Sequence, residues 1–390
     1  MEGEEGDWLA LRKVVLRRAA LEGAPLTYQD DCSALVSLAD VLHGRFQKDE
    51  DEADFNDVIT LRRAALKLTP PGHAERLAHL DIFAKLLDGR FRKKGGMEDL
   101  TETVTLRRAV LELTHPGHPE HLASLVNLAD CLEERFQRND SMEDLTEIIT
   151  HRRDALGLTL PGHPEHLACL INLGNCLDQL FKREGGAEHL TEIITLRRAA
   201  LELTPPGHPD RIRSLSNLSK CLDQRFRRDG SMEDLMEAIT HQRAALKLAP
   251  PGHPERLESL VNLADCLDQQ FTREGDVEFL MDIITLRRAA LELTPPGHPE
   301  RFASLVNLAS SLDQQIKGLR DDTLTDLEEI ISLRRSALEC TPSAPSDQCM
   351  FLINLAACLR ENYQKMGAQA ELDEAIVHAR AALATCPPEH

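Results

Sequence analysis

Aromatic residues are scarce in this sequence: they make up 4% of 390 positions, and only one is tryptophan. A core without large rings must be built from Leu, Ile and Ala, which favours helices over a β-sandwich or barrel. No apolar run approaches the length that spans a membrane. The hydrophobic share of 42% indicates a folded chain, and 390 residues exceed one ordinary core, so several domains or a repeat array are expected.

An excess of basic residues is also missing. The net charge of -20 argues against nucleic acid and anionic membranes as partners, because both attract basic faces. The first residues, MEGEEGDW, lack the basic-then-apolar pattern of a signal peptide. Ten cysteines without a CxxC pair or a signal sequence predict reduced thiols in the cytosol or nucleus, and we take the protein to be cytoplasmic.

A repeat is present instead. One glycine recurs in equal steps of 45 residues, at Gly72, Gly117, Gly162, Gly207, Gly252 and Gly297. Between these glycines the text "LVNLADCLEERF" (125–136) returns as "LINLGNCLDQLF" and "LVNLADCLDQQF". Such agreement does not arise from composition, and a fixed period of this length is typical of stacked repeats.

Each unit predicts two helices. Leu125, Leu128 and Leu132 recur at helical spacing in the first, and Leu145 and Ile148 do so in the second. Ser141, with an acidic residue three positions on, predicts a capping box at the start of the second helix. A single pair cannot bury its apolar face, so stacking of the pairs is expected.

The predicted organisation is an all-α solenoid of about eight helical hairpins after an N-terminal orphan or capping helix. The last unit lacks a polar capping helix, so we expect the chain to be a fragment of a longer protein or to dock something at that end. The orphan segment is 1–28 and the solenoid is 29–390, with repeats at 29–70, 71–115, 116–160, 161–205, 206–250, 251–295, 296–342 and 343–390.

These units resemble the tetratricopeptide repeat. Its pattern of large, small and large residues on the first helix is met by Leu215, Leu218, Ser219 and Leu222, and the closing proline by Pro250. The unit is longer than the standard 34 residues. Its text "GHPE…LVNLA…RRAALEL" is similar to kinesin light chain repeats, and closer still to fungal arrays that precede a caspase-like CHAT protease domain. The resemblance implies a right-handed superhelix that binds other proteins, although this chain has Leu or Arg where aromatic residues are usual.

The resemblance also implies where a ligand would lie. The first helices would line the groove, and an asparagine two positions after each leading leucine matches residues that hold a peptide backbone in related arrays. One carboxamide both donates and accepts a hydrogen bond, which suits that role. A ladder of asparagines bonded to neighbouring helices is the alternative. The residues are Asn127, Asn172, Asn217, Asn262, Asn307 and Asn354.

A second, acidic ladder follows on the same helices, at Asp178, Asp223, Asp268 and Asp313. It predicts either a stripe that attracts a basic or polar peptide or a solvated helix face. Arginine pairs on the second helices are expected to form salt bridges with these acids or between repeats, and less readily a phosphate-binding row. These pairs are Arg107–Arg108, Arg152–Arg153, Arg197–Arg198, Arg287–Arg288 and Arg334–Arg335.

Sites of catalysis or metal binding find little support. The column of Cys131, Cys176, Cys221 and Cys266 predicts small buried side chains, because helices stacked about 8–10 Å apart are too distant for disulfides. HPEH at 118–121 and 163–166 lacks a third metal ligand, and other repeats have Arg at its last position. We therefore expect no enzyme, metal or cofactor, and read the histidine of each PGHP link as a turn residue.

The predicted function is an interaction scaffold that binds an extended peptide or partner protein in its groove. The alternatives are the sensing half of a larger fungal protease or signalling protein and, with less support, an atypical enzyme holding a small molecule in the groove. The sequence does not identify the partner or the oligomeric state.

Overall fold

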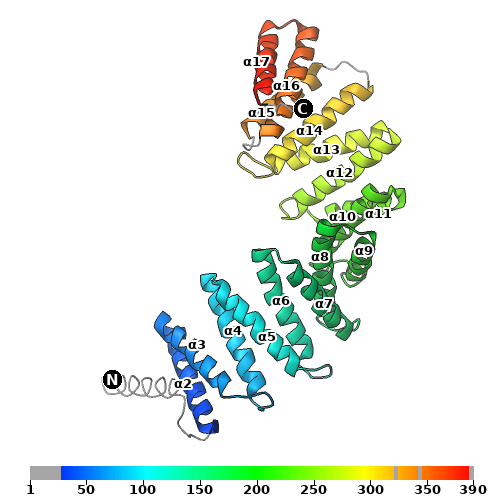
Figure 1. Ribbon diagram of the computed structural model, residues 1–390. Coiled ribbons are helices and arrows are strands. Elements are labelled where there is room, and N and C mark those ends of the chain that lie inside the picture. The colour runs from blue at the N-terminus through cyan, green and yellow to red at the C-terminus, as the bar shows by residue number, and fades with distance from the viewer. Residues whose placement is uncertain (1–27, 320–323, 341–344, 386–390) are drawn as a thin grey trace. The chain divides into compact units, whose positions relative to one another are not determined.

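The computed structural model describes residues 28–319, 324–340 and 345–385, and the predicted orphan helix at 1–28 lies almost entirely outside them. The described residues form sixteen helices and no strand, in a series of antiparallel hairpins (Figure 1). The predicted all-α fold of repeated helical hairpins is therefore confirmed. The chain separates into two compact units, Met1–His189 and Leu190–His390, which are described separately.

In the first unit, three hairpins are followed by one further helix. Each hairpin consists of a first helix, called helix A, and a second, called helix B. Each helix B also packs on the next helix A, as α3 does on α4 and α5 on α6. The helices are α2 (Tyr28–Asp49), α3 (Glu52–Lys67), α4 (Arg76–Lys94), α5 (Met97–Leu113), α6 (His121–Asn139), α7 (Met142–Leu158) and α8 (His166–Glu184).

The second unit repeats this arrangement, and α9 begins just before its boundary. The same alternation of helix A and helix B continues from α10 to α17. The helices are α9 (Ala187–Glu202), α10 (Arg211–Asp229), α11 (Met232–Leu248), α12 (Arg256–Glu274), α13 (Val277–Glu292), α14 (Arg301–Leu319), α15 (Leu324–Glu339), α16 (Pro345–Met366) and α17 (Gln369–Thr385). The repeat boundaries given above remain a prediction.

The core consists of the apolar stripes that the sequence predicts. Leu128 and Leu132 on α6 and Ile148 on α7 are fully buried. Burial of such a side chain contributes about 1.5–3 kcal/mol. The last hairpin differs, because Ile376 on α17 is 42% exposed whereas Ile149, in the same place on α7, is 4% exposed. The face that a further repeat would cover is therefore accessible on α17.

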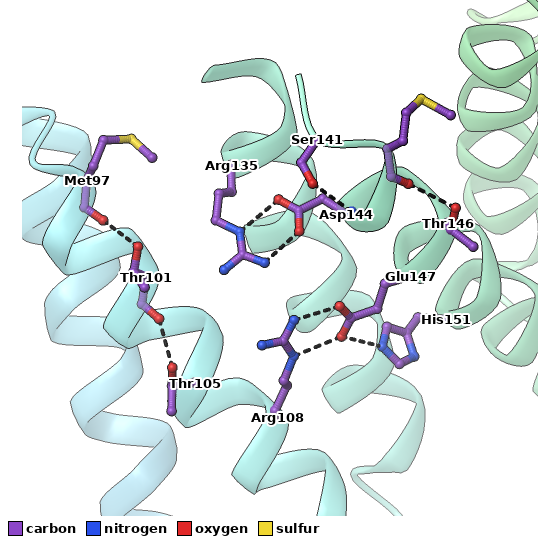
Figure 2. A network of polar contacts seen from close by, with 11 residues as sticks. Met97, Thr101, Thr105, Arg108, Arg135, Ser141, Asp144, Thr146, Glu147 and His151 are labelled. Carbon is purple, nitrogen blue, oxygen red and sulfur yellow. Dashed lines mark hydrogen bonds and ion pairs between the residues drawn. The ribbon is translucent and has the colours of Figure 1, made fainter. Parts of the chain in front are cut away.

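Polar contacts fix the turn in several of the hairpins. Ser141 accepts a hydrogen bond from the backbone N–H of Asp144 at 3.3 Å, which confirms the predicted cap of α7. The carboxylate of Asp144 in turn receives both arms of Arg135 from α6, at 2.8 and 2.6 Å (Figure 2). Equivalent pairs join Arg90 to Asp99 and Arg225 to Asp234.

The links between hairpins are fixed by their histidines. In each of six links the histidine Nδ1 accepts the backbone N–H two residues on, as His298 does from Glu300 at 3.1 Å. The preceding glycine has a positive φ, which is +100° at Gly117. A side chain at this φ is strained, which explains the recurring glycine. The reading of this histidine as a turn residue is confirmed.

Candidate functional site: the space between successive helices A

The buried arginines of the helices B determine what lies between neighbouring helices A. Arg287 on α13 is 8% exposed and contacts both sides: its Nη2 lies 3.3 Å from Asp268 on α12, and its Nη1 donates to the carbonyl of Asn307 on α14 at 3.1 Å. In the first unit, Arg152 is 2% exposed and pairs with Asp130 and, at 3.2 Å, with Glu133. The predicted pairing of these arginines with helix A acids is thus confirmed.

The outer arginine of four of these pairs joins successive helices B. Arg108 on α5 donates to both oxygens of Glu147 on α7, at 2.9 and 2.6 Å (Figure 2). These hydrogen bonds hold the pKa of Glu147 below its ordinary value. The expected salt bridges between repeats are confirmed at this position and at its equivalents, Arg63–Glu102, Arg198–Glu237, Arg288–Glu329 and Arg335–Glu374.

A cavity of about 530 Å³, called the α12–α14 cavity, lies between α12 and α14, and Arg287 is one of the residues that line it. Asn262 of α12 and Asn307 of α14 both line it, so two members of the predicted asparagine ladder open on one space. Five of the six ladder asparagines are half-buried, and Asn354 is exposed. The Nδ2 of Asn262 is buried without a hydrogen-bond partner. Among the described residues, none of the six side chains bonds to a neighbouring helix, so the alternative of an internal ladder is not observed.

The acidic ladder is arranged differently from the asparagine ladder. Its four members are half-buried, and each forms an ion pair within the chain: Asp178–Lys182 at 2.7 Å, Asp223–Arg227 at 2.8 Å, Asp268–Arg287 at 3.3 Å and Asp313–Lys317 at 2.9 Å. Burial nevertheless raises the pKa of Asp223. The ladder is therefore neither a free acidic stripe nor a fully solvated face, and its role in binding stays a prediction.

Other carboxylates line the α12–α14 cavity, and the sequence analysis did not single them out. They are Glu258, Asp265 and Glu300, against one guanidinium, that of Arg287. Burial raises the pKa of Asp265, with Arg287 opposing at 3.5 Å. Asp265 belongs to the repeated "NLAD" sequence, about one helical turn after the ladder asparagine Asn262, so the signal was present in the sequence.

The cysteine column is buried as predicted. Cys131, Cys176, Cys221 and Cys266 are at most 7% exposed and are free thiols. Burial raises the pKa of Cys131 to about 11 and that of Cys176 to about 12, so these thiols are protonated and unreactive at neutral pH. Cys349 is a correction to the expectation of reduced thiols throughout, since it is disulfide-bonded.

The HPEH histidines have structural partners. The Nδ1 of His166 lies 3.1 Å from the hydroxyl of Thr159. In a later repeat the equivalent residue is Arg301, whose Nη1 donates to the backbone carbonyl of Thr294 at 2.5 Å. No group of three metal-ligating side chains occurs among the described residues. In the same part of the chain, no helix is long and apolar enough to cross a membrane.

Comparisons with known proteins agree with the fold. No family model matches the chain, and no curated protein does. Among solved structures, the chain is similar to the tetratricopeptide-like repeats of a kinesin light chain-type protein from Podospora anserina, with 20% identity and a TM-score of 0.37 over 58% of this chain and all of the other. It is also similar to a tetratricopeptide repeat protein from Parabacteroides merdae, with 14% identity and a TM-score of 0.43 over 80% of this chain and 94% of the other.

A third similar structure is a signal-transduction ATPase with a tetratricopeptide repeat sensor from Pyrococcus horikoshii. The identity is 12% and the TM-score 0.44, and the match covers 98% of this chain but 53% of the other. All three likenesses concern the repeated helical hairpin, which is the resemblance already seen in the sequence.

Proposed function

We propose that this chain is a protein-interaction scaffold that binds an extended, basic segment of a partner protein between its successive helices A. The observation that carries the proposal is the α12–α14 cavity, where Asn262 and Asn307 from neighbouring repeats face one space with their carboxamides unbonded within the chain. A peptide backbone offers one donor and one acceptor per residue, which such carboxamides can satisfy.

The preference for basic segments follows from the charges of the same cavity. Three carboxylates line it against one guanidinium: Arg287 is shared between Asp265 and Asp268, Glu258 pairs with Lys220, and no ion pair is seen for Glu300 among the described residues. A lysine or arginine of the ligand would stabilise the charged form of Asp265, whose pKa burial raises. Asn217 and Asn354 would extend the backbone contacts within the second unit, Asn127 and Asn172 would offer equivalent contacts within the first, and the acidic-ladder residues would add polar contacts.

The test is selection from a random peptide library on the full chain, followed by affinity measurement of the enriched peptides. We expect enrichment of Lys and Arg, and a loss of affinity of about tenfold or more when Asn262 and Asn307 are both changed to Ala, because two polar groups of the peptide lose their partners. Asn139→Ala, on the exposed end of α6, is the matched control. Unchanged affinity in the double variant, or enrichment of acidic peptides, would overturn the proposal.

The absence of catalysis, a cytoplasmic location and the role as sensing half of a larger fungal protein remain predictions.

A further inference from the structure

The first unit has a larger cavity at a place where the second unit is closed. In the second unit, the Nε2 of Gln269 on α12 donates to Asp223 on α10 at 3.0 Å and so bridges two successive helices A. Four 45-residue periods earlier, the same two positions hold Gly89 on α4 and His43 on α2. A glycine cannot form this bridge, and a cavity of about 640 Å³, called the α2–α4 cavity, lies there.

Packing does not require the glycine. A Cβ added at Gly89 would meet no atom within 4 Å, and its φ is not positive. Glycine in the interior of a helix weakens that helix relative to other residues. The only consequence of Gly89 on the described structure is therefore the space that its missing side chain leaves between the two helices.

The floor of the α2–α4 cavity is apolar and aromatic. The rings of Phe46 and Phe55 lie 4.5 Å apart between centroids, and the His43 ring lies 6.3 Å from Phe55. Ile82, 38% exposed, lines the same space at the position where later repeats carry the ladder asparagines. These groups offer contact to a flat ring or an alkyl chain and few hydrogen bonds to a peptide backbone.

The rim carries charges of both signs: five cations, Arg62, Lys85, Arg90, Lys93 and Lys94, and three carboxylates, Asp40, Glu50 and Glu52. Arg90, Lys85 and Lys94 are held by Asp99, Asp81 and Glu52. Lys93 differs: its Nζ lies 5.1 Å from the centroid of the Phe46 ring, and it pairs with no carboxylate among the described residues. The Nδ1 of His43 is buried without a hydrogen-bond partner.

We propose that the α2–α4 cavity binds a small amphiphilic anion, with an aromatic or alkyl body about the size of naphthalene and one carboxylate. The body would lie against Phe46, Phe55 and Ile82 in the space left at Gly89, and the carboxylate would pair with Lys93. The cavity volume falls within the roughly 300–1,000 Å³ of small-molecule sites, which are likewise apolar with a few polar groups. This site is separate from the α12–α14 cavity, so the two proposals stand or fall independently.

The experiment compares two probes of the same shape and opposite charge on the full chain: 2-naphthoate and 2-naphthylmethylammonium, titrated by calorimetry. We expect naphthoate to bind one site and to bind about tenfold more tightly than the cation, as one added charge-assisted contact allows. Gly89→Gln, which restores the residue of later repeats, should weaken naphthoate binding at least tenfold by filling the space. Lys93→Gln should abolish most of the preference for the anion.

Gly157→Gln is the matched control, because Gly157 is exposed on helix α7 and a Cβ there also meets nothing within 4 Å. This variant should bind naphthoate as the parent chain does. Thermal unfolding establishes that both glutamine variants are folded. Equal binding of the two probes, retained binding in folded Gly89→Gln, or capture of an acidic peptide at this cavity without binding of naphthoate would each overturn the proposal.

Discussion

The α2–α4 and α12–α14 cavities both lie between two successive helices A, yet they differ in aromatic content and in the balance of charge. The α2–α4 cavity has Phe46, Phe55 and Ile82 on its floor and five basic side chains against three carboxylates at its rim, whereas the α12–α14 cavity has two asparagines and one guanidinium against three carboxylates. The buried leucines that build the hairpins are equivalent in both units. The comparison teaches that the repeated residues specify the helices, while the positions that break the repeat specify what the spaces between them can bind.

The largest expected effect tests whether a core substitution in one unit destabilises only the hairpins next to it. Leu132→Ala in the first unit and Leu267→Ala in the second each remove a side chain that is at most 1% exposed. Each should lower the free energy of unfolding by about 3 kcal/mol. In a repeat array each unit contacts only its neighbours, so the loss of amide protection in hydrogen exchange should centre on the altered hairpin. Equal loss over every described helix would contradict this locality.

The next effect concerns a buried position that differs between the units. Gln242 on α11 is fully buried at the place of Arg152, and Lys220 stands at the place of Asp130. Arg152→Gln should cost about 2 kcal/mol, because it leaves Asp130 and Glu133 without their hydrogen-bond donor. Adding Asp130→Lys, which reproduces the Gln242 pattern, should recover about 1 kcal/mol of that loss in denaturant unfolding.

If the losses of unfolding free energy for Arg152→Gln and Asp130→Lys simply added in the double variant, the two positions would not be coupled. Asp154→Lys, on the exposed face of α7, provides the control for the change in charge alone.

A smaller effect separates the two kinds of glycine. Gly89→Ala should raise the free energy of unfolding by about 1 kcal/mol. The added Cβ has room in the helix, and alanine leaves the unfolded chain fewer conformations to lose on folding than glycine does. Gly117→Ala should lower the same quantity by about 1 kcal/mol, since φ there is +100°. Thermal unfolding measures both, and a gain at Gly117 or a loss at Gly89 would contradict the assignment.

The smallest effect is the acid sensitivity of the outer salt bridges. Arg108 lowers the pKa of Glu147 below its unfolded value of 4.5, so the stabilisation is complete above that pH and is lost as the pH falls through the folded pKa. Glu147→Gln should therefore cost less than about 1 kcal/mol at pH 7, because the pair is partly exposed, and nothing once the carboxylate is protonated. Urea unfolding at pH 7 and below pH 3 measures the difference, and an equal cost at both would contradict this role.

The sequence was sufficient for the parts that obey the period. The helices, the cap at Ser141, the buried cysteine column and the histidine of each link follow from residue type and spacing alone. The ion pairs of the acidic ladder could be predicted only in part. Three members, Asp178, Asp223 and Asp313, each pair with a cation four residues further along the same helix. That spacing is visible in the sequence, and it predicts such a pair.

The α2–α4 cavity could not be predicted, because it results from a missing side chain. Spacing shows which helix face carries Gly89, but the space becomes apparent only against the bridge that Gln269 forms in the other unit. The three carboxylates of the α12–α14 cavity come from α12 and from the segment before α14, so their convergence depends on the packing angle of two helices, which the sequence pattern does not contain.

The salt bridges between helices B have one further consequence, for how such a chain changes in evolution. In each of them the arginine belongs to one repeat and the glutamate to the next, as with Arg63–Glu102 and Arg108–Glu147. A repeat such as 71–115 therefore carries a donor for its successor, Arg108, and an acceptor for its predecessor, Glu102. A gene duplication or deletion of one whole period joins two ends that already match, so the array can change in length without new interface residues, and binding sites can then diverge at single positions.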